Sequence, residues 1–355
     1  MGILGATGMV GQRFVALLER HPSFEVVLVA ASAQSAGKKY REAVAGRWAM
    51  PTAVPSAVAE LEVRDASAVG EIAPAVDFVF CATDMSKEAT LALEEAYAKA
   101  ETPVVSNNSA HRAAPDVPMM IPEVNPEHCR VVDAQRKRLG TARGFIAVKP
   151  NCSLQSYVPA LHPLKKFGLR RVAVATYQAI SGAGKTFETW PEMLDNVIPF
   201  IKGEEEKSER EPMKIWGSLD GGRIVDARDP VISAQCIRVP ATDGHLAAVF
   251  ASFDQRPSPE EVTELWKSFV ERTANARPPW RAEALPHLLR RRKRPQTRLD
   301  RDIGGGMGVA IGRLRRDAIF DYRFVCLSHN TVRGAAGGAV LTAELLAAEG
   351  YISGK

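Results

Sequence analysis

The hydrophobic positions at the start of the chain follow the pattern of a strand, a turn and a helix. A short apolar run at residues 3–4 meets a glycine-rich turn, and residues 10–18 then place their apolar side chains on one face of a helix. Residues 24–32 (FEVVLVAAS) form a continuous apolar run, which is typical of a parallel strand buried on both faces. Together the three segments predict a β-α-β unit.

Two more strands and a helix extend this unit. Residues 76–83 (VDFVFCAT) and 102–108 (TPVVSNN) have the apolar composition of strands, and the Ala/Glu-rich stretch 87–99 between them has that of a helix. Alternation of strands with helices indicates a doubly wound parallel sheet. We therefore predict a Rossmann-like dinucleotide-binding domain over residues 1–147.

The pattern changes after residue 147. Longer strands follow in which apolar and polar residues alternate, which predicts a mostly antiparallel sheet with one polar face. A helix over 258–273 interrupts these strands, and the Ala/Leu-rich segment 331–355 predicts a final helix that returns to the first domain and completes it. The predicted fold class is α/β, with a second, α+β domain over residues 148–330.

The length and composition suit an enzyme-sized globular protein of two domains. The chain has 355 residues, of which 46% are hydrophobic and 25% charged, and single cores rarely grow much past ~250 residues. No stretch reaches the roughly 18 uncharged apolar residues that a membrane span needs, and the N-terminus lacks the pattern of a secretory signal. We expect a cytoplasmic protein with no membrane partner.

The cysteines and the charge exclude several classes of site. The five cysteines show neither a CxxC pair nor the spacing of a zinc site, so no metal is expected, and four of them should pack as small apolar residues. The formal net charge of +5 fits anionic substrates. Five consecutive basic residues, Arg290 to Arg294, resemble a nuclear-localisation or RNA patch, but no aromatic platform accompanies them, so no nucleic-acid partner is expected.

The glycine-rich turn has the spacing GxxGxxG, with Gly5, Gly8 and Gly11. In a dinucleotide site the first glycine makes the tight turn, the second lets the backbone approach the pyrophosphate, and the third lets the helix pack against the strand. The helix N-terminus then faces the phosphate charge. The position between a strand and a helix favours a dinucleotide cofactor, and the alternative is a glycine-rich packing turn.

The residues after the second strand favour NADP over NAD. An NAD site usually has Asp or Glu there to bind the ribose 2′-hydroxyl, and the stretch 30–38 contains no carboxylate. Ser32 and Ser35 can donate hydrogen bonds and Lys38 can offset charge, which suits a 2′-phosphate. The alternative is that these residues form a solvated loop.

Cys152 has an unusual setting, between Asn151 and Ser153 and just after an apolar run. Pro150 ends the strand, and a helix is predicted to follow, so the thiol would feel the positive end of the helix dipole, which favours the thiolate. Asn151 is suited to stabilise an oxyanion. At this point a nucleophilic Cys152 and an ordinary core cysteine both remain open.

A thiolate nucleophile needs a group that gives or takes a proton. His245 leads modestly among the seven histidines, because a loop enters a strand there and the ring would project at a sheet edge. Arg238 lies in a strand that leads toward the same cleft, and arginine binds carboxylates bidentately. The alternatives are a structural histidine and a surface ion pair.

Three further charged residues are candidates for anion or substrate contacts. Arg112 follows the strand at 102–108, where doubly wound folds place their ligands. In the densely charged stretch 203–217, Glu211 and Lys214 are three residues apart and share a helix face, so they are suited to line a pocket. The alternative is that this stretch is the solvated face of a helix.

Several stretches occur together in an order that identifies a family. They include GILGATGMVGQRF, VVSNNSAHR, KPNCSLQSY, YQAISGAGKT, CIRVPATDGH and SHNTVRGAAGGA. Over nearly its whole length the chain resembles the aspartate-semialdehyde dehydrogenase family, most closely the branch shared by archaea, fungi and some bacteria. The resemblance implies that the second domain is catalytic and mediates dimerisation, and that the protein is a homodimer or homotetramer.

The resemblance also implies a role for each catalytic candidate. Cys152 would be the acylated nucleophile and His245 the acid/base. Gln178 would orient the substrate beside the thiol, with Asn151 helping to position the acyl group. Arg238 would bind the substrate α-carboxylate. The other implied contacts are Glu211 to the amino group, Lys214 and Arg112 to the phosphate, Gly5, Thr7, Gly8, Met9 and Val10 to the dinucleotide phosphates, Ser32, Ser35 and Lys38 near the 2′-phosphate, and Ser181, Gly182 and Asn330 around the nicotinamide.

Two features depart from the family pattern. The loop after the second strand usually reads RSAGK, and here Gln34 replaces the arginine, which weakens the prediction of NADP and admits NAD. The stretch SGAGK also lacks the YPG continuation that often follows SGAG.

The implied enzyme is an NADP-dependent aldehyde dehydrogenase of the phosphorylating class. In the biosynthetic direction it would use NADPH to reduce L-4-aspartyl phosphate to L-aspartate 4-semialdehyde and phosphate through a Cys152 thioester, a step in lysine, methionine and threonine biosynthesis. The alternative is a malonyl-CoA reductase-like enzyme that reduces another acyl thioester on the same fold. N-acetylglutamyl-phosphate reductase fits less well, because the amine that Glu211 would meet is blocked in its substrate. A non-catalytic dinucleotide-binding regulator would need none of the Cys, His, Gln and Arg set.

Overall fold

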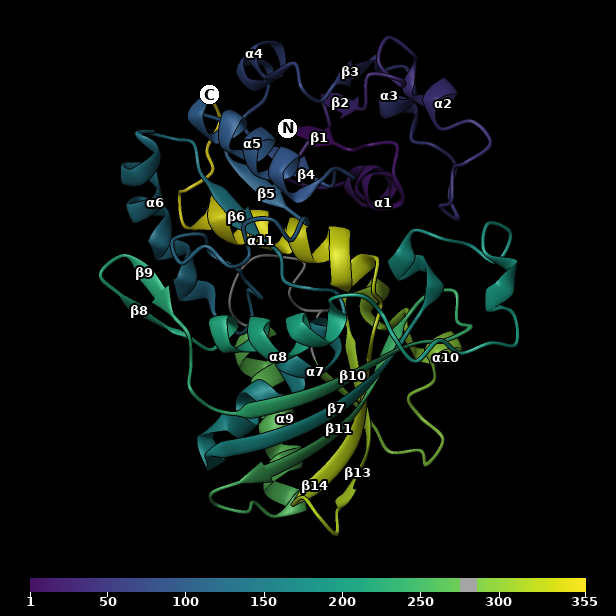
Figure 1. The fold of residues 1–355 in the computed structure, drawn as a ribbon, viewed down its shortest axis with the longest axis vertical. Coiled ribbons are helices and arrows are strands. Elements are labelled where there is room, and N and C mark those ends of the chain that lie inside the picture. The colour runs from purple at the N-terminus through teal and green to yellow at the C-terminus, as the bar shows by residue number, and fades with distance from the viewer. Residues whose placement is uncertain (275–285) are drawn as a thin grey trace.

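Two large sheets, one in the upper half of Figure 1 and one in the lower half, organise the structure. The structure is a computed structural model that describes residues 1–274 and 286–355. Within the described residues, no helix combines the length and the apolar character that a bilayer span requires.

The first sheet is parallel throughout and has the strand order β3-β2-β1-β4-β5-β6. This is the order of a doubly wound dinucleotide-binding fold, so the predicted Rossmann-like architecture is confirmed. The strands are short because each is a buried apolar run that ends at a turn. Their bounds are β1 Gly2–Leu4, β2 Leu28–Ala31, β3 Val63–Asp65, β4 Val79–Cys81, β5 Val104–Ser106 and β6 Ile146–Val148.

Helices cover both faces of this sheet. Alternate strand residues belong to two apolar clusters, one shared with α5 and the other shared with α1 and the C-terminal helix α11. The helix α11 therefore joins the core of the first sheet although it comes last in the chain (Figure 1). The helices of this half are α1 Met9–Leu18, α2 Tyr40–Ala43, α3 Ser56–Ala59, α4 Val69–Ile72, α5 Lys87–Lys99, α6 Val132–Leu139 and α11 Gly337–Ala348.

The second sheet is mixed, with the order β10-β7-β11-β14-β13-β12. Its central pairs are antiparallel, as predicted, while the outermost pairs β10–β7 and β12–β13 are parallel. A separate hairpin is formed by β8 Ser218–Asp220 and β9 Arg223–Val225. The sheet strands are β7 Leu169–Gln178, β10 Val231–Arg238, β11 His245–Phe253, β12 Pro286–Leu289, β13 Val309–Arg316 and β14 Tyr322–Ser328.

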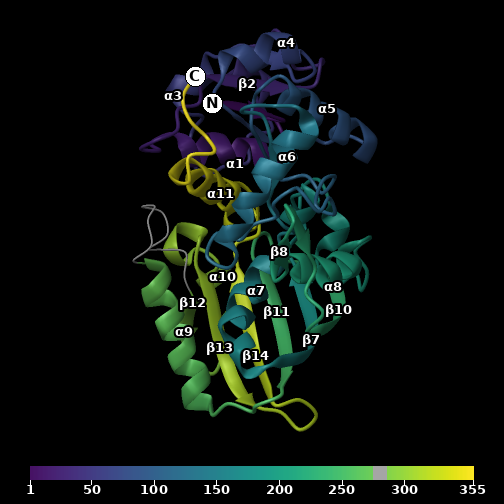
Figure 2. The same cartoon turned by 90° about the vertical axis from the view of Figure 1, so that its left-hand side faces the viewer.

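One face of the second sheet packs against helices α7 and α9, as Figure 2 shows. The opposite face carries the alternate residues of β7 and β11, many of them apolar and only partly buried. The helices of this half are α7 Leu154–Leu161, α8 Glu204–Ile215, α9 Pro259–Ala274 and α10 Thr297–Asp300. Shorter turns of 3-10 helix include Ala73–Ala75, Pro126–Val131, His162–Phe167, Ile180–Ala183, Pro191–Met193 and Ile303–Gly306, and a π-helical turn, Val332–Ala336, leads into α11.

Candidate active site

Cys152 lies in the turn between β6 and α7, and its thiol meets an imidazole from the second sheet. The Cys152 Sγ atom is 3.4 Å from His245 Nε2. Cys152 is partly exposed, whereas the other four cysteines are buried. Gly334 lets the C-terminal segment lie against Cys152, because a Cβ added there would lie 2.9 Å from Cys152 Cβ. The structure thus joins two residues that are 93 positions apart.

His245 is the first residue of β11 and its imidazole is fully buried. The backbone N–H of Ala179 donates a 3.1 Å hydrogen bond to His245 Nδ1. Burial, with a further contribution from Arg238, lowers the pKa of His245 to about 3. The ring is therefore neutral near pH 7, and because Nδ1 accepts, Nε2 carries the proton and points it at the Cys152 sulfur.

Opposing influences act on the thiol. Burial is the largest cause that raises the pKa of Cys152, and Glu204 is the next. The cations Lys149, Arg112 and Arg238 act in the opposite direction. Ionisation of Cys152 therefore depends on how these buried charges are arranged around it.

Glu204, which sequence reasoning missed, organises the two amides beside the thiol. Its carboxylate accepts hydrogen bonds of 2.9 and 3.0 Å from Asn151 Nδ2 and of 3.2 Å from Gln178 Nε2. Glu204 is the first residue of α8 and is 8% exposed. Only its position at the start of the charged stretch 203–217 marks it in the sequence, and its neighbour Glu206 is exposed. The packing of α8, not its composition, decides which glutamate turns inward.

Arg238 lies at the end of β10, beside Gln178 at the end of β7. Its guanidinium is buried and donates a 2.7 Å hydrogen bond to the Ala179 carbonyl. A Cβ added at Gly182 would lie 3.0 Å from Arg238 Nη1 and 3.1 Å from His245 Nε2. A side chain at position 182 would therefore crowd both groups, which places Arg238 and His245 side by side next to Gly182.

Arg112 and Glu211 form a second polar group next to Asn151. Arg112 Nη1 is 2.9 Å from Glu211 Oε1, and Arg112 Nη2 donates a 2.9 Å hydrogen bond to the Asn107 carbonyl. The other Glu211 oxygen accepts a 2.6 Å hydrogen bond from the Asn151 backbone N–H. The two residues thus lie beside Asn151, the residue before Cys152, and are paired with each other.

Lys214 differs from the expected phosphate ligand. Its Nζ donates three hydrogen bonds, of 2.7, 2.6 and 2.8 Å, to the carbonyls of Arg112, Ala114 and Val117. Burial lowers the pKa of Lys214 to about 8. An ammonium has three donors, so all are committed in this arrangement. Lys214 here fixes the loop that carries Arg112.

The glycine turn between β1 and α1 has the geometry of a phosphate cradle. Gly5 adopts φ +82°, and a Cβ there would lie 2.3 Å from the Ala82 carbonyl oxygen. A Cβ at Gly11 would lie 2.2 Å from the Gly5 carbonyl oxygen, so the close packing of α1 on β1 requires glycine. Gly8 caps α1 without a side-chain hydrogen bond, which leaves the N–H groups of Met9 and Val10 at the helix start for an anion. Thr7 lies in the same turn, and its carbonyl accepts a hydrogen bond from Gln12.

The loop after β2 has an arginine that sequence reasoning missed. Arg47 Nη2 is 3.5 Å from the Ser35 hydroxyl. Ser32, Gln34 and Lys38 are exposed around it. Arg47, 12 residues beyond Ser35, thus brings a guanidinium to the loop in which Gln34 stands.

Asn330 connects the C-terminal segment to the catalytic residues. Its Nδ2 donates a 2.8 Å hydrogen bond to Ser181 Oγ, and its Oδ1 accepts one of 2.8 Å from the N–H of Gly244, the residue before His245. Asn330 and Ser181 thus lie together beside the loop that leads into His245. Residues of the loop after β2 (Ser32, Ser35 and Lys38) have no described hydrogen bond or ion pair to this group.

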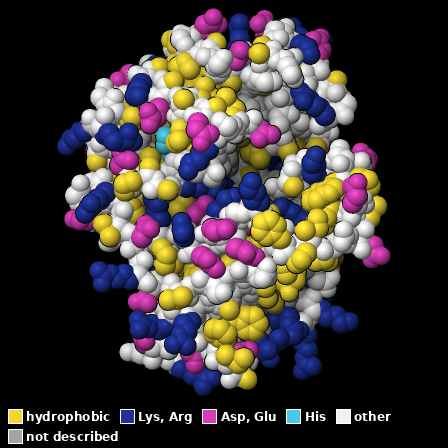
Figure 3. All heavy atoms as spheres, in the orientation of Figure 1, with side chains coloured by type: hydrophobic (Ala, Val, Ile, Leu, Met, Phe, Trp, Pro, Cys, Tyr) yellow, Lys and Arg dark blue, Asp and Glu magenta, His cyan; other side chains and the backbone are white. Residues whose placement is uncertain are grey.

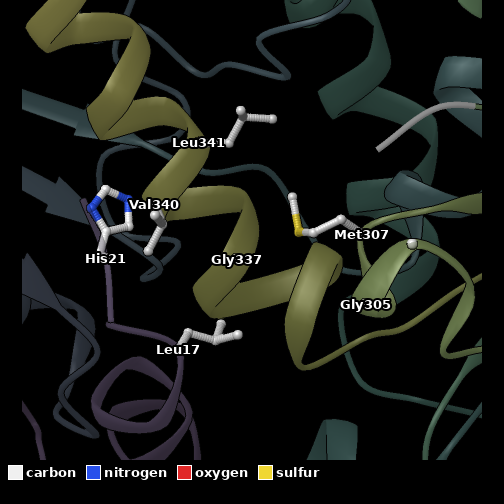
Figure 4. Close-up of a pocket in the computed structure, with 8 residues that line it drawn as sticks. Leu17, His21, Gly305, Met307, Gly337, Val340 and Leu341 are labelled. Carbon is white, nitrogen blue, oxygen red and sulfur yellow. The ribbon is translucent and has the colours of Figure 1, made fainter. Parts of the chain in front are cut away.

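A hollow near the middle of the molecule, between its two halves, has lysine and arginine side chains gathered around it in Figure 3. A different, apolar pocket lies where α1 meets α11 and the 303–307 turn (Figure 4). Leu17, Val340 and Leu341 line it, together with the imidazole of His21, which is 3.3 Å from Glu344. That pocket contains none of the predicted site residues, so the chemistry belongs to the Cys152 group.

Comparison with known proteins matches both halves of the chain. Residues 1–132 match the family model for the semialdehyde dehydrogenase NAD binding domain, and residues 161–333 match that for the semialdehyde dehydrogenase dimerisation domain. The aspartate-semialdehyde dehydrogenase of Archaeoglobus fulgidus is 43% identical over 356 residues, covering 99% of each chain. That of Aspergillus fumigatus is 41% identical over 360 residues, covering 99% of this chain and 98% of the relative.

Solved structures agree with this. The aspartate-semialdehyde dehydrogenase of Candida albicans with NADP has a TM-score of 0.87 and 37% identity, covering 99% of both chains. Aspartate-semialdehyde dehydrogenase II of Vibrio cholerae complexed with ASA has a TM-score of 0.75 and 26% identity, covering 98% of both chains. The similarity extends over both sheets and the segment that joins them.

Proposed function

The chain belongs to the aspartate-semialdehyde dehydrogenase family, and on that premise we propose that it reduces L-4-aspartyl phosphate to L-aspartate 4-semialdehyde and phosphate with Cys152 as the nucleophile. The observation that carries the proposal is the 3.4 Å contact between Cys152 Sγ and His245 Nε2 beside the buried Arg238. The malonyl-CoA reductase-like alternative is not favoured by the relatives, which are named aspartate-semialdehyde dehydrogenases.

The first half-reaction uses the thiol and the amides beside it. The Cys152 sulfur attacks the acyl carbon, the carbon–oxygen bond to phosphate breaks, and phosphate leaves with the electron pair, giving a thioester. The Asn151 and Gln178 amides, which Glu204 holds together, would position the acyl group.

Substrate recognition follows from the charges around the thiol. Arg238 binds the α-carboxylate, because its buried guanidinium offers planar, paired donors. Glu211 binds the substrate amino group. Arg112 releases its ion pair with Glu211 and binds the substrate phosphate instead. Lys214 supports phosphate binding indirectly, by fixing the loop that carries Arg112, because its own three donors are occupied by backbone carbonyls.

The second half-reaction needs a hydrogen-bond donor at the leaving sulfur. Bound nicotinamide supplies the hydride that reduces the thioester carbonyl carbon. His245 holds a proton on Nε2, 3.4 Å from the sulfur, because the Ala179 N–H occupies Nδ1. The imidazole is therefore placed to donate a hydrogen bond from Nε2–H to the sulfur as the carbon–sulfur bond breaks, which stabilises the leaving thiolate while the aldehyde is released.

The glycine cradle fits a dinucleotide, and NADP is the proposed cofactor. Backbone N–H groups of Met9 and Val10 would hold the pyrophosphate at the start of α1, which the Gly5–Gly8 turn lets it approach. Ser35 and Arg47 would hold the 2′-phosphate, since arginine is the usual partner of that group. Residues Ser181, Gly182 and Asn330 would surround the nicotinamide. We assign this cofactor function to residues 1–147 with 331–355, and catalysis and dimerisation to 148–330.

The uncovered face of the second sheet supports a homodimer. Ala173, Ala175 and Tyr177 on β7, with Ala248 and Phe250 on β11, are only partly buried there, while the other face packs on helices. An apolar sheet face of this kind is typical of a subunit interface. Replacing Phe250 with glutamate should yield monomers in sedimentation experiments, whereas wild type should sediment as a dimer or tetramer.

A biosynthetic role places the enzyme in the cytoplasm, where its five free cysteines remain reduced. The test of the proposed activity is phosphate-dependent oxidation of aspartate semialdehyde, followed by nicotinamide absorbance with NADP and NAD in parallel. The wild type should turn over with NADP preferred, and Cys152→Ser should not. Equal turnover by Cys152→Ser, or reduction of malonyl-CoA in preference to aspartyl phosphate, would refute the proposal.

A further inference from the structure

The hydrogen bonds of His245 limit what the imidazole does for the resting thiol. Its Nδ1 accepts from the Ala179 N–H, so the proton of the neutral ring lies on Nε2, toward Cys152 Sγ. A nitrogen that already bears a proton cannot accept another from the thiol. A contact from the Gly244 carbonyl favours the protonated ring but is a smaller influence than burial. Ionisation of Cys152 therefore needs positive charge from another residue.

Lys149 is a buried cation three residues before the nucleophile. It directly follows β6, its backbone N–H donates a 2.9 Å hydrogen bond to the Ser106 carbonyl, and its side chain is 2% exposed. Its Nζ donates to the carbonyl of Pro150, the residue between the strand end and the catalytic turn. The ammonium is thus held inside the turn that carries Cys152, out of contact with solvent.

Two glycines of the C-terminal segment pack directly against Cys152 and Lys149. Gly334 faces Cys152, where an added Cβ would lie 2.9 Å from Cys152 Cβ. Gly338, four residues on, faces Lys149, where an added Cβ would lie 3.3 Å from Lys149 Cδ. Residues four apart on a helix lie on the same side, so the lysine and the cysteine stack along one side of the segment.

The carboxylates near this pair are committed to other partners. The charged groups that act on Lys149 are Arg112, Cys152, Glu211 and Arg333, and the Cys152 influence exceeds that of Glu211. Glu211 is held by Arg112 and by the Asn151 N–H, while Arg333 pairs with Glu123 at 3.0 Å. Within the described part of the chain, no ion pair joins Lys149 to a carboxylate. The thiolate of Cys152 is the anion that remains to balance it.

We propose that Lys149 is a positioning residue whose buried ammonium favours the ionised form of Cys152. In this pair the amine keeps its proton, the thiol releases its proton to solvent, and the His245 Nε2–H donates a hydrogen bond to the resulting thiolate. Arg112 and Arg238 act in the same direction, and Glu204 opposes all three. Burial, the largest cause, lowers the pKa of Lys149 to about 7, so its charge changes within the working pH range. The inference rests on the proposed role of Cys152 as nucleophile.

The test is the pH dependence of Cys152 alkylation by iodoacetamide in the full chain, without substrate or cofactor. Mass spectrometry assigns the label to Cys152, since the other cysteines are buried. In Lys149→Met, which matches the length of the side chain, the alkylation midpoint should rise by at least about one pH unit, and the rate at pH 7 should fall about 10-fold. Lys149→Arg should restore the rate to within about 3-fold of wild type, because the charge returns.

The matched control is Lys165→Met, which removes a different lysine whose pKa burial also lowers and which lies over Trp216. It should leave the midpoint unchanged. A folded Lys149→Met variant whose midpoint equals that of wild type would overturn the proposal. If that variant does not fold, Lys149→Gln keeps a donor for the Pro150 carbonyl and takes its place.

A second measurement does not alter the lysine. Coupling between two charges is reciprocal, so removing the thiolate in Cys152→Ser should lower the pKa of Lys149. The titration of Lys149 is measured from the chemical shift of its ε-carbon in isotopically labelled protein. An unchanged lysine titration would overturn the proposal. Alkylation and lysine titration need no turnover, so failure here is distinct from failure to oxidise aspartate semialdehyde.

Discussion

Replacing Glu204 with glutamine separates the positioning of Asn151 and Gln178 from the charge of the carboxylate. Glu204 accepts from Asn151 Nδ2 at 2.9 and 3.0 Å and from Gln178 Nε2 at 3.2 Å, in a buried position. Glutamine keeps one acceptor oxygen, but its amide nitrogen is a donor and would face the Asn151 or Gln178 nitrogen, which is also a donor. The contacts with Asn151 and Gln178 should therefore both weaken.

The size of the effect follows from the kind of hydrogen bond. Bonds to a charged acceptor contribute about 1.5–3 kcal/mol and neutral ones about 0.5–1.5 kcal/mol, so two donors lose together about 2–3 kcal/mol. If this loss appears in the transition state, kcat/KM for aspartate semialdehyde should fall roughly 30- to 150-fold. The assay is steady-state turnover with NADP and phosphate.

The thiol should respond in the opposite direction. Glu204 raises the pKa of Cys152, second only to burial, so its neutralisation lowers that pKa and should speed alkylation of Cys152 at pH 7. Glu206→Gln is the control, because Glu206 lies on the same helix but is exposed. Slower alkylation in Glu204→Gln, or turnover within about 3-fold of wild type, would refute the assigned role, since a lost positioning contact predicts a larger fall.

Three further predictions follow from the site. Burial lowers the pKa of His245 to about 3, below the value of 6.5 in the unfolded chain. Between pH 6.5 and pH 3 the unfolded chain therefore binds a proton that the folded chain does not, so the free energy of unfolding should fall as the pH drops through this range. The contribution reaches about 5 kcal/mol, and His245→Gln should flatten urea-midpoint-against-pH curves; an equal slope would contradict this. Arg47→Ala should raise KM for NADP about 10-fold with little change for NAD, since a charge-assisted bond is lost, whereas Arg41→Ala, whose partner is Glu60, should change neither. Gly182→Ala places a Cβ 3.0 Å from Arg238 Nη1, so kcat should fall while the melting temperature is retained; unchanged kcat would show that the space is not used.

The fold class could be read from the chain because it depends on local periodicity. Buried apolar runs and amphipathic helices alternate in the first half, and alternating strands follow in the second, so the two kinds of sheet were predictable. The glycine spacing at Gly5, Gly8 and Gly11 likewise reports a turn made by neighbouring residues. The parallel outer pairs β10–β7 and β12–β13 were not predictable, because strand order depends on distant segments.

In the candidate site, too, the identity of the residues was readable from the sequence, whereas their contacts were not. Residue chemistry and the resemblance singled out Cys152, and the structure placed His245 beside it through the pairing of β7 with β11. The state of each group, however, depends on partners far along the chain. The tautomer of His245 is determined by Ala179, 66 residues away, and the donors of Lys214 by carbonyls about 100 residues away.

Sequence by itself determined which residues were available for acyl transfer and what local elements they begin or end. Tertiary structure alone decided that Glu204 faces inward while Glu206 faces solvent, and that Lys149 is buried with its ammonium on the Pro150 carbonyl. The physical reason is that burial and charge pairing are properties of the packed chain. A side chain's pKa and hydrogen bonds depend on groups that meet it only after folding, and no spacing within one segment encodes them.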